Sequence, residues 1–172
     1  MLGIPEGPPA PAPIRWLSNF LDALILLMGT CMVGIVFFNI LNRIFQFNVA
    51  MTTELCEFMM TWVTFLGGAA ASRRGIHMTI TEFIDKLDEK KRFLADALVQ
   101  IFCAVVLTVC IWYGISIVNM NKENLLTVLG WSKAWQYMGL PVGFSFALIF
   151  TLFDIYQIMR GVSRSERYGA GE

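Results

Sequence analysis

The chain has 172 residues, of which 56 % are hydrophobic and 15 % are charged, and its mean hydropathy is +0.62. Ordinary globular domains are about 45–50 % apolar with glycine included and about 25 % charged. The 13 basic and 13 acidic residues cancel, which excludes the strongly basic surface typical of nucleic-acid binding. The composition therefore predicts an integral membrane protein of the all-α class.

Four apolar runs follow a proline-rich start. Residues 5–13 read PEGPPAPAP, which is too rich in proline for a helix, so residues 1–14 are expected to form a cytoplasmic tail. Each run is long enough, at about 1.5 Å per residue, to cross the ~30 Å core of a bilayer. We expect a membrane domain over residues 15–160 and a second cytoplasmic tail over 161–172. The predicted transmembrane helices cover residues 20–41, 51–72, 93–118 and 140–159.

The distribution of Lys and Arg predicts the orientation. Cytoplasmic connections carry an excess of these residues, and most of them fall before the first span, between the second and third, and after the fourth. Both termini are therefore expected in the cytoplasm. The connection between the second and third spans alone contains Arg73, Arg74, Lys86, Lys90, Lys91 and Arg92.

Two connections are expected to hold structure of their own. Residues 79–92 place apolar side chains at helical spacing opposite charged ones, and Thr79 and Glu82 match a capping box. This pattern predicts an amphipathic helix along the cytoplasmic membrane surface. Residues 125–139 are expected to form an interfacial segment on the periplasmic side. The aromatic anchors of that segment are Trp131, Trp135 and Tyr137.

Ionisable residues within spans are functional candidates because burying a charge in lipid is costly. Asp22, Asp96 and Asp154 fall near the cytoplasmic ends of their spans. An ion-paired ring is the favoured interpretation, and a proton relay is the alternative, although a relay would need carboxylates nearer the midplane. The basic residues at the same level are Arg15, Arg73, Arg74 and Arg160.

Glu54 and Glu57 lie one helical turn apart in the outer half of the second span. Three interpretations stay open for this pair. The carboxylates pair locally near the interface, for example with Arg43; they bind a cation or take part in proton coupling; or they contact another membrane protein. No charge is predicted at the centre of any span. A four-helix bundle of this kind is poorly equipped to carry an ion or an anionic solute by itself.

Trp62 lies near the middle of the second span, where a tryptophan either packs within the chain or anchors a neighbouring helix. Gly67 and Ala71 follow it at a spacing of four residues, and Gly143 and Ala147 repeat that spacing in the fourth span. Small residues at this spacing let transmembrane helices approach closely. Both positions are therefore candidate helix contacts.

The residues offer little for catalysis. His77 is the single histidine, and the sequence holds no arrangement typical of a hydrolase, a phosphate-binding loop or a metalloenzyme. The four cysteines lie in apolar runs without a Cys-x-x-Cys pair, which argues against a zinc site or a disulfide framework. We expect a non-catalytic protein without a cofactor or metal.

A family resemblance appears in the second span and the turn after it, at Thr53-Glu54-Leu55, Trp62, residues 65–70 (FLGGAA) and residues 73–77 (RRGIH). Together with the aromatic approach to residues 140–143 (LPVG), these residues resemble the small membrane subunit (Q, or DctQ-type) of tripartite ATP-independent periplasmic (TRAP) transporters. The resemblance covers nearly the whole chain except the proline-rich start and the last ten residues.

The resemblance implies a small permease subunit in the inner membrane of a bacterium. Its transporter would import an organic acid, such as sialic acid or a C4-dicarboxylate, using a sodium or other cation gradient. The implied partners are a large membrane (M) subunit, which would hold the solute and cation sites, a periplasmic substrate-binding protein, and membrane lipids. Candidate subunit or lipid contacts are Glu54, Trp62, Arg73, Arg74 and His77, to which the small-residue face adds Gly67 and Ala71.

Two alternatives from other classes remain. One is a self-sufficient homodimeric exporter of four-span chains with Glu54 or Glu57 as its coupling carboxylate. The other is a membrane assembly protein without a transport role. The charged surface helix and the off-centre depth of both glutamates speak against the exporter.

Overall fold

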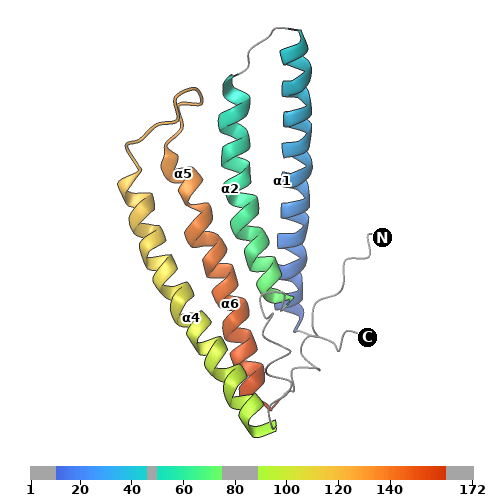
Figure 1. The fold of residues 1–172 in the computed structure, drawn as a ribbon, viewed down its shortest axis with the longest axis vertical. Helices are drawn as coiled ribbons and strands as arrows, with labels where there is room; N and C mark the ends of the chain where they lie inside the picture. The colour runs from blue at the N-terminus through green and yellow to red at the C-terminus, as the bar shows by residue number, and fades with distance from the viewer. Residues whose placement is uncertain (1–10, 46–49, 75–88, 162–172) are drawn as a thin grey trace.

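The computed structural model describes residues 11–45, 50–74 and 89–161, and the regular elements within these ranges are α-helices. Four helical stretches have the length and apolar composition to cross a membrane, which are Ala12–Asn42, Met51–Arg73, Phe93–Met120 and Lys133–Met159. In these described ranges, the predicted all-helical fold with four helices long and apolar enough to span a membrane is therefore confirmed. The elements are α1 (Ala12–Ile44), α2 (Ala50–Arg73), α4 (Glu89–Met120), α5 (Lys133–Tyr137) and α6 (Gly139–Met159) (Figure 1).

Helix α1 begins earlier than the proline content predicts. It starts at Ala12, inside the predicted tail of residues 1–14, and includes Pro13 in its first turn. The carbonyl of Pro11 accepts hydrogen bonds from the backbone N–H groups of Ile14 (3.0 Å) and Arg15 (3.2 Å). Proline is tolerated at this place because a first-turn N–H has no partner within the helix.

The predicted surface helix over residues 79–92 falls mostly on residues 75–88, which lie outside the described ranges, as does His77. Its last residues, 89–92, begin the long helix α4 instead. Glu89 and Lys90 therefore extend a membrane-spanning helix beyond its apolar part.

The spanning helices form an open row, with α6 lying between α2 and α4. Helix α1 packs on α2, α2 packs on α6, and α6 packs on α4, so the spatial order differs from the order in the chain (Figure 1). The expected four-helix bundle is wrong in this respect, because a bundle would bring the two outermost helices together. A row leaves more of each helix facing lipid. This costs little in a membrane, since lipid tails solvate apolar side chains well.

The core lies where α1, α2 and α6 meet. Leu21, Leu66 and Phe150, one from each helix, are almost completely buried, and Trp62 and Phe146 pack against them. Away from this point the apolar side chains face outward. On α4, for example, Phe102 and Trp112 are 69 % and 77 % exposed, which makes lipid or a partner protein their expected environment.

Close approach of α2 and α6 depends on Gly143. A Cβ atom added there would lie 2.6 Å from the Cβ of Phe65 and 2.7 Å from its carbonyl oxygen. Ala147, one turn further along α6, is 4 % exposed. The small-residue spacing predicted in the fourth span therefore serves contact within the chain.

Candidate functional site

The outer end of the row is the end that carries residues 121–138, here called the outer segment. It contains α5 and lies beside the first half of α2 (Figure 1). Glu54 of α2 connects this helix to the outer segment. Its carboxylate accepts hydrogen bonds from the backbone N–H of Val128 (3.0 Å to each oxygen) and from that of Leu129 (2.9 Å). A carboxylate that accepts from two successive N–H groups fixes the position of a loop firmly.

Further contacts continue inward along α2. The rings of Phe58 and Trp131 meet edge to face with their centroids 6.1 Å apart. The Nε1–H of Trp62 donates to the carbonyl of Trp135 at 3.2 Å, and Trp62 also packs against Gly139 at the start of α6. The outer segment thus follows α2 from Glu54 to Trp62, over more than two helical turns.

The outer segment is also held together internally. The backbone N–H of Leu126 donates to the carbonyl of Trp131, and that of Lys133 donates to the carbonyl of Asn124, both at 2.7 Å. Gly130 has a φ of +66°, a conformation that side chains disfavour. Ser132 caps α5 by accepting from the N–H of Ala134. The short helix α5 lies within residues 125–139, and the location of these residues at the membrane interface stays a prediction.

The aromatic residues predicted as anchors differ in exposure. Trp131 and Trp135 are 51 % and 58 % exposed, whereas Tyr137 is half-buried. Leu125 and Val128 add exposed apolar surface to the same segment. This segment is therefore ordered and exposes a partly apolar surface.

At the inner end, the structure brings part of the predicted ring together. Arg74 of α2 forms an ion pair of 2.8 Å with Asp22 of α1, and each side chain is about a quarter exposed. Arg160 instead lies over the ring of Tyr156, with its Cζ atom 4.6 Å from the ring centre. Arg15 is exposed. The pair between Asp22 and Arg74 fastens α1 to the C-terminal end of α2.

The other predicted members of the ring are buried. Arg73, Asp96 and Asp154 are each 3–4 % exposed, and each has a polar or electrostatic interaction. Gln100 and Thr151, 3 % and 5 % exposed, are also buried, and the sequence reasoning missed them. Gln100 follows Asp96 by one helical turn, so the shared face of α4 was the signal that could have identified it.

Helix α2 has one face that no described part of the chain covers. Thr53, Glu57, Met60 and Thr64 are exposed there, and Gly67 and Ala71 continue the face inward. This set of six residues, spaced alternately by four and three positions, is called the α2 stripe. A Cβ atom added at Gly67 would meet no atom within 4 Å. In contrast to Gly143, Gly67 is therefore open in the part of the chain that the structure describes.

The candidate contact residues thus separate into different environments. Glu54 binds the outer segment, Trp62 packs in the interior, and Arg73 and Arg74 lie at the inner end, whereas Gly67 and Ala71 lie on the open α2 stripe. In the part of the chain that the structure describes, no group of three His, Cys, Asp or Glu side chains is placed to hold a metal ion.

Comparison with known proteins identifies the family. The family model for the DctQ component of tripartite ATP-independent periplasmic transporters matches residues 32–161. The chain belongs to the DctQ family. It is thus a DctQ-type small permease subunit, a multi-pass protein of the inner membrane, and its family is not an enzyme class.

Individual relatives agree with this assignment. The sialic acid TRAP transporter small permease protein SiaQ of Vibrio cholerae serotype O1 is 33 % identical over 115 residues, which cover 65 % of this chain and 66 % of the relative, just under two thirds of its length. A Haemophilus influenzae protein, provisionally named a TRAP transporter small permease protein, is 22 % identical over 148 residues. That match covers 83 % of this chain and 89 % of the relative.

Proposed function

We propose that this DctQ subunit packs against the large membrane subunit of a TRAP transporter and enlarges its contact with the bilayer, without performing a chemical step. The transporter imports an organic acid delivered by a periplasmic binding protein and driven by a cation gradient, with Na⁺ as the expected ion. The α2 stripe is the observation that carries this proposal, because it is a helix face left open by an otherwise well-packed helix.

The length and composition of the stripe support a helix as its occupant. From Thr53 to Ala71 it extends about 27 Å along α2, close to the ~30 Å thickness of the bilayer core. Alternating spacings of three and four residues are typical of helix contacts, and small residues such as Gly67 and Ala71 allow close approach. A transmembrane helix of the large subunit matches these dimensions.

The placement of charge supports a subunit rather than a self-sufficient carrier. The charged side chains buried in the described part of the chain, Arg73, Asp96 and Asp154, lie at the inner end. Glu54 is engaged by the outer segment. We infer that the solute and cation sites belong to the large subunit.

The transported solute is proposed to be a carboxylate, either sialic acid, a C4-dicarboxylate or a similar organic acid. The relative from Vibrio cholerae carries the name of a sialic acid transporter subunit, which makes sialic acid the first solute to test. Uptake of radiolabelled sialic acid by cells that express the complete transporter is the direct assay.

Orientation is proposed from the excess of Lys and Arg in three segments of the chain. Both termini and the Asp22–Arg74 end of the row would face the cytoplasm, and the outer segment would face the periplasm. Trp131, Trp135 and Tyr137 would then lie at the outer headgroups. The same surface would be presented to the periplasmic binding protein.

Affinity purification from native bacterial membranes in mild detergent tests the proposal. With a tag at the C-terminus, the parent chain should retain a much larger polytopic partner in equal amount. Gly67→Leu should lower that recovery severalfold, because the larger Leu side chain would keep a helix of the large subunit away from the α2 stripe. Gly29→Leu is the matched control, since a Cβ atom at Gly29 of α1 also meets no atom within 4 Å. A chain recovered alone, or a complex unaffected by Gly67→Leu, would contradict the proposal.

A further inference from the structure

Two consecutive arginines stand at the inner end of α2, and the structure places them in different environments. Arg73 is 3 % exposed, whereas Arg74 is about a quarter exposed and pairs with Asp22 of α1 at 2.8 Å. A guanidinium keeps its charge when it is buried, so inside a membrane protein it needs a polar partner. Arg73 has a polar or electrostatic interaction, and the identity of its partner decides which helix it holds.

Two carboxylates are candidates for the partner of Arg73. Among the acidic side chains that the structure describes, Asp22 is engaged by Arg74. Three others lie toward the outer end, which are Glu54, Glu57 and Glu123. Asp96 of α4 and Asp154 of α6 remain, each 4 % exposed and each with a polar or electrostatic interaction. The register of the helices distinguishes between these two.

The contact between α2 and α6 gives the first register. Both helices run from the outer end inward (Figure 1), and Gly143 faces Phe65, since a Cβ atom added at Gly143 would lie 2.6 Å from the Phe65 Cβ. Arg73 comes eight residues after Phe65 and is therefore level with residue 151. Asp154 is three residues further, about 4.5 Å along the axis, which an arginine side chain spans. It also shares the α2-facing side of α6, because it follows Gly143 by about three helical turns.

The contact between α4 and α6 places Asp96 too far inward. These helices run in opposite directions (Figure 1), and a Cβ atom added at Gly114 would lie 3.4 Å from the Cδ of Pro141. Asp96 comes 18 residues before Gly114 and is therefore level with residue 159. That is about 12 Å beyond the level of Arg73. Helix α4 also packs on α6 and α5 and not on the face of α2.

We propose that Arg73 forms a buried ion pair with Asp154, so that the two arginines hold the two helices that flank α2. Arg74 holds α1 through Asp22, and Arg73 holds α6 through Asp154. We call these two pairs the arginine clamp. The clamp closes the inner end of the core in which α1, α2 and α6 meet.

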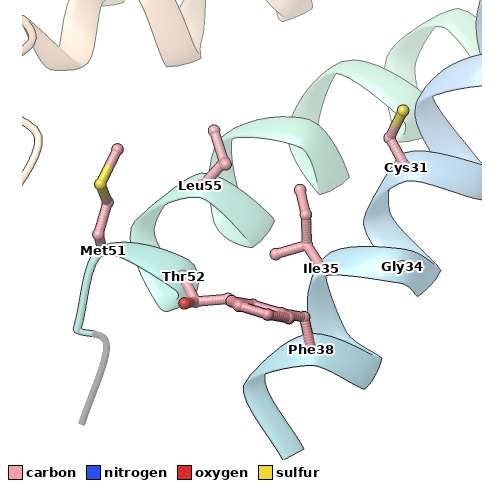
Figure 2. Close-up of a pocket in the computed structure, with 7 residues that line it drawn as sticks. All are labelled: Cys31, Gly34, Ile35, Phe38, Met51, Thr52 and Leu55. Carbon is pink, nitrogen blue, oxygen red and sulfur yellow. The ribbon is translucent and has the colours of Figure 1, made fainter. Parts of the chain in front are cut away.

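The clamp matters because apolar contacts alone hold α1 and α2 loosely. Their outer halves leave a groove, with Ile35 on one side and Leu55 on the other (Figure 2). In lipid, apolar surface does not select a neighbouring helix, whereas a buried charge is stable only beside its counter-charge. The clamp therefore specifies which helices flank α2, and it assigns Arg73 to the interior and not to a lipid or subunit contact. This inference rests on the packing within the chain and stands whether or not the chain binds a large subunit.

Double-mutant cycles on the full-length chain, purified in mild detergent, test the pair by thermal unfolding. Loss of one member leaves the other charge buried and uncompensated, so Arg73→Gln and Asp154→Asn should each lower the melting temperature by about 10 °C. The double variant should melt no lower than the less stable single variant. Arg74→Gln is the matched control, because loss of its partly exposed pair should lower the melting temperature by only about 2 °C.

Asp96→Asn provides the comparison for Asp154→Asn. Combined with Arg73→Gln, its effect should add to that of the single variants, because the register separates Asp96 from Arg73. Additive effects of Arg73→Gln and Asp154→Asn would overturn the proposal. So would a coupling of Arg73 to Asp96 in place of Asp154.

Exchange of the two charges tests the same pair should the single variants fail to yield purified protein. Arg73→Asp and Asp154→Arg should each lower the amount of chain in the membrane severalfold, and the combination of both should restore most of it. An arginine side chain in a helix points back toward the N-terminus, which directs the exchanged guanidinium from position 154 toward position 73. A combined variant that accumulates no better than the single variants would contradict the pairing.

Discussion

The carboxylate of Glu54 accepts a hydrogen bond of 2.9 Å from the backbone N–H of Leu129, across 75 residues of sequence. Neighbouring bonds from Val128 make Glu54 the main polar connection between α2 and the outer segment. Because the donors are backbone groups, the connection depends on the shape of the loop and not on the side chains of Val128 and Leu129. Glu54 thus fixes the position of the segment relative to α2 in this structure.

Removing the Glu54 carboxylate should loosen the outer segment. Hydrogen bonds to a charged group contribute about 1.5–3 kcal/mol each, so Glu54→Ala should lower the melting temperature of the detergent-solubilised protein and speed amide exchange at Val128 and Leu129. Glu54→Gln keeps one acceptor and should have a smaller effect, with partial transport retained.

Glu57→Ala provides the comparison for Glu54, because the Glu57 carboxylate is exposed on the α2 stripe and forms no hydrogen bond with the residues that the structure describes. Its amide exchange at residues 128 and 129 should match that of the parent. Complete loss of transport in Glu54→Gln with an intact complex would instead assign Glu54 a direct part in coupling.

Gly143→Ala should separate α2 from α6. The new methyl group meets the backbone of Phe65 at less than 3 Å, and backbone cannot rotate away as a side chain can. Overpacking of this kind costs about 1–3 kcal/mol. Gly67→Ala, with open space around its Cβ, should be neutral or slightly stabilising, because Ala favours a helix by about 1 kcal/mol over Gly. Thermal unfolding compares the stability of Gly143→Ala with that of Gly67→Ala. Equal stabilities would contradict the close packing of α2 and α6 at Gly143.

The ion pair between Asp22 and Arg74 should contribute modestly. Both side chains are about a quarter exposed, so a double-mutant cycle of Asp22→Asn and Arg74→Gln should give a coupling free energy of about 0.5–1 kcal/mol. The coupling should weaken as ionic strength rises. A coupling energy indistinguishable from zero at low salt would show that the pair does not stabilise the contact between α1 and α2.

Reporter fusions should place the C-terminus in the cytoplasm. Green fluorescent protein fused after Glu172 should fluoresce, and alkaline phosphatase at the same place should be inactive. Conversely, a Ser132→Cys variant should react with a membrane-impermeant maleimide added to intact spheroplasts. An active phosphatase fusion would reverse the orientation proposed from Lys and Arg.

The four spans could be predicted because an apolar run of sufficient length is visible in the sequence itself. The predicted runs 51–72 and 140–159 differ from α2 and α6 by only one residue at each end, or none. The order of the helices in the row could not be predicted from the sequence. Residues such as Phe102 and Phe150 are equally apolar, although Phe102 faces outward and Phe150 is buried. In lipid, hydrophobicity does not mark the packed face.

Contacts between residues were predictable only in part. The spacing of Gly143 and Ala147 indicates a close approach, but nothing in it names Phe65 as the neighbour. The sequence correctly predicted that Asp22 and Arg74 lie near the same end of the spans, because both are charged and both fall close to the end of an apolar run. The partner of Glu54 could not be identified, because Val128 and Leu129 offer only backbone N–H groups, which every residue except proline has.

The position of α6 between α2 and α4 also constrains biogenesis. Helices enter the membrane in chain order as synthesis proceeds, so α4 is inserted before the helix on which it packs exists. Until α6 is inserted, α4 lies in the lipid without its packing partner. The helices α1 and α2 are by then already packed against each other. The final helix completes the row, and truncation before Gly139 would remove the packing of α4 on α6 while the outer segment still connects α4 to α2.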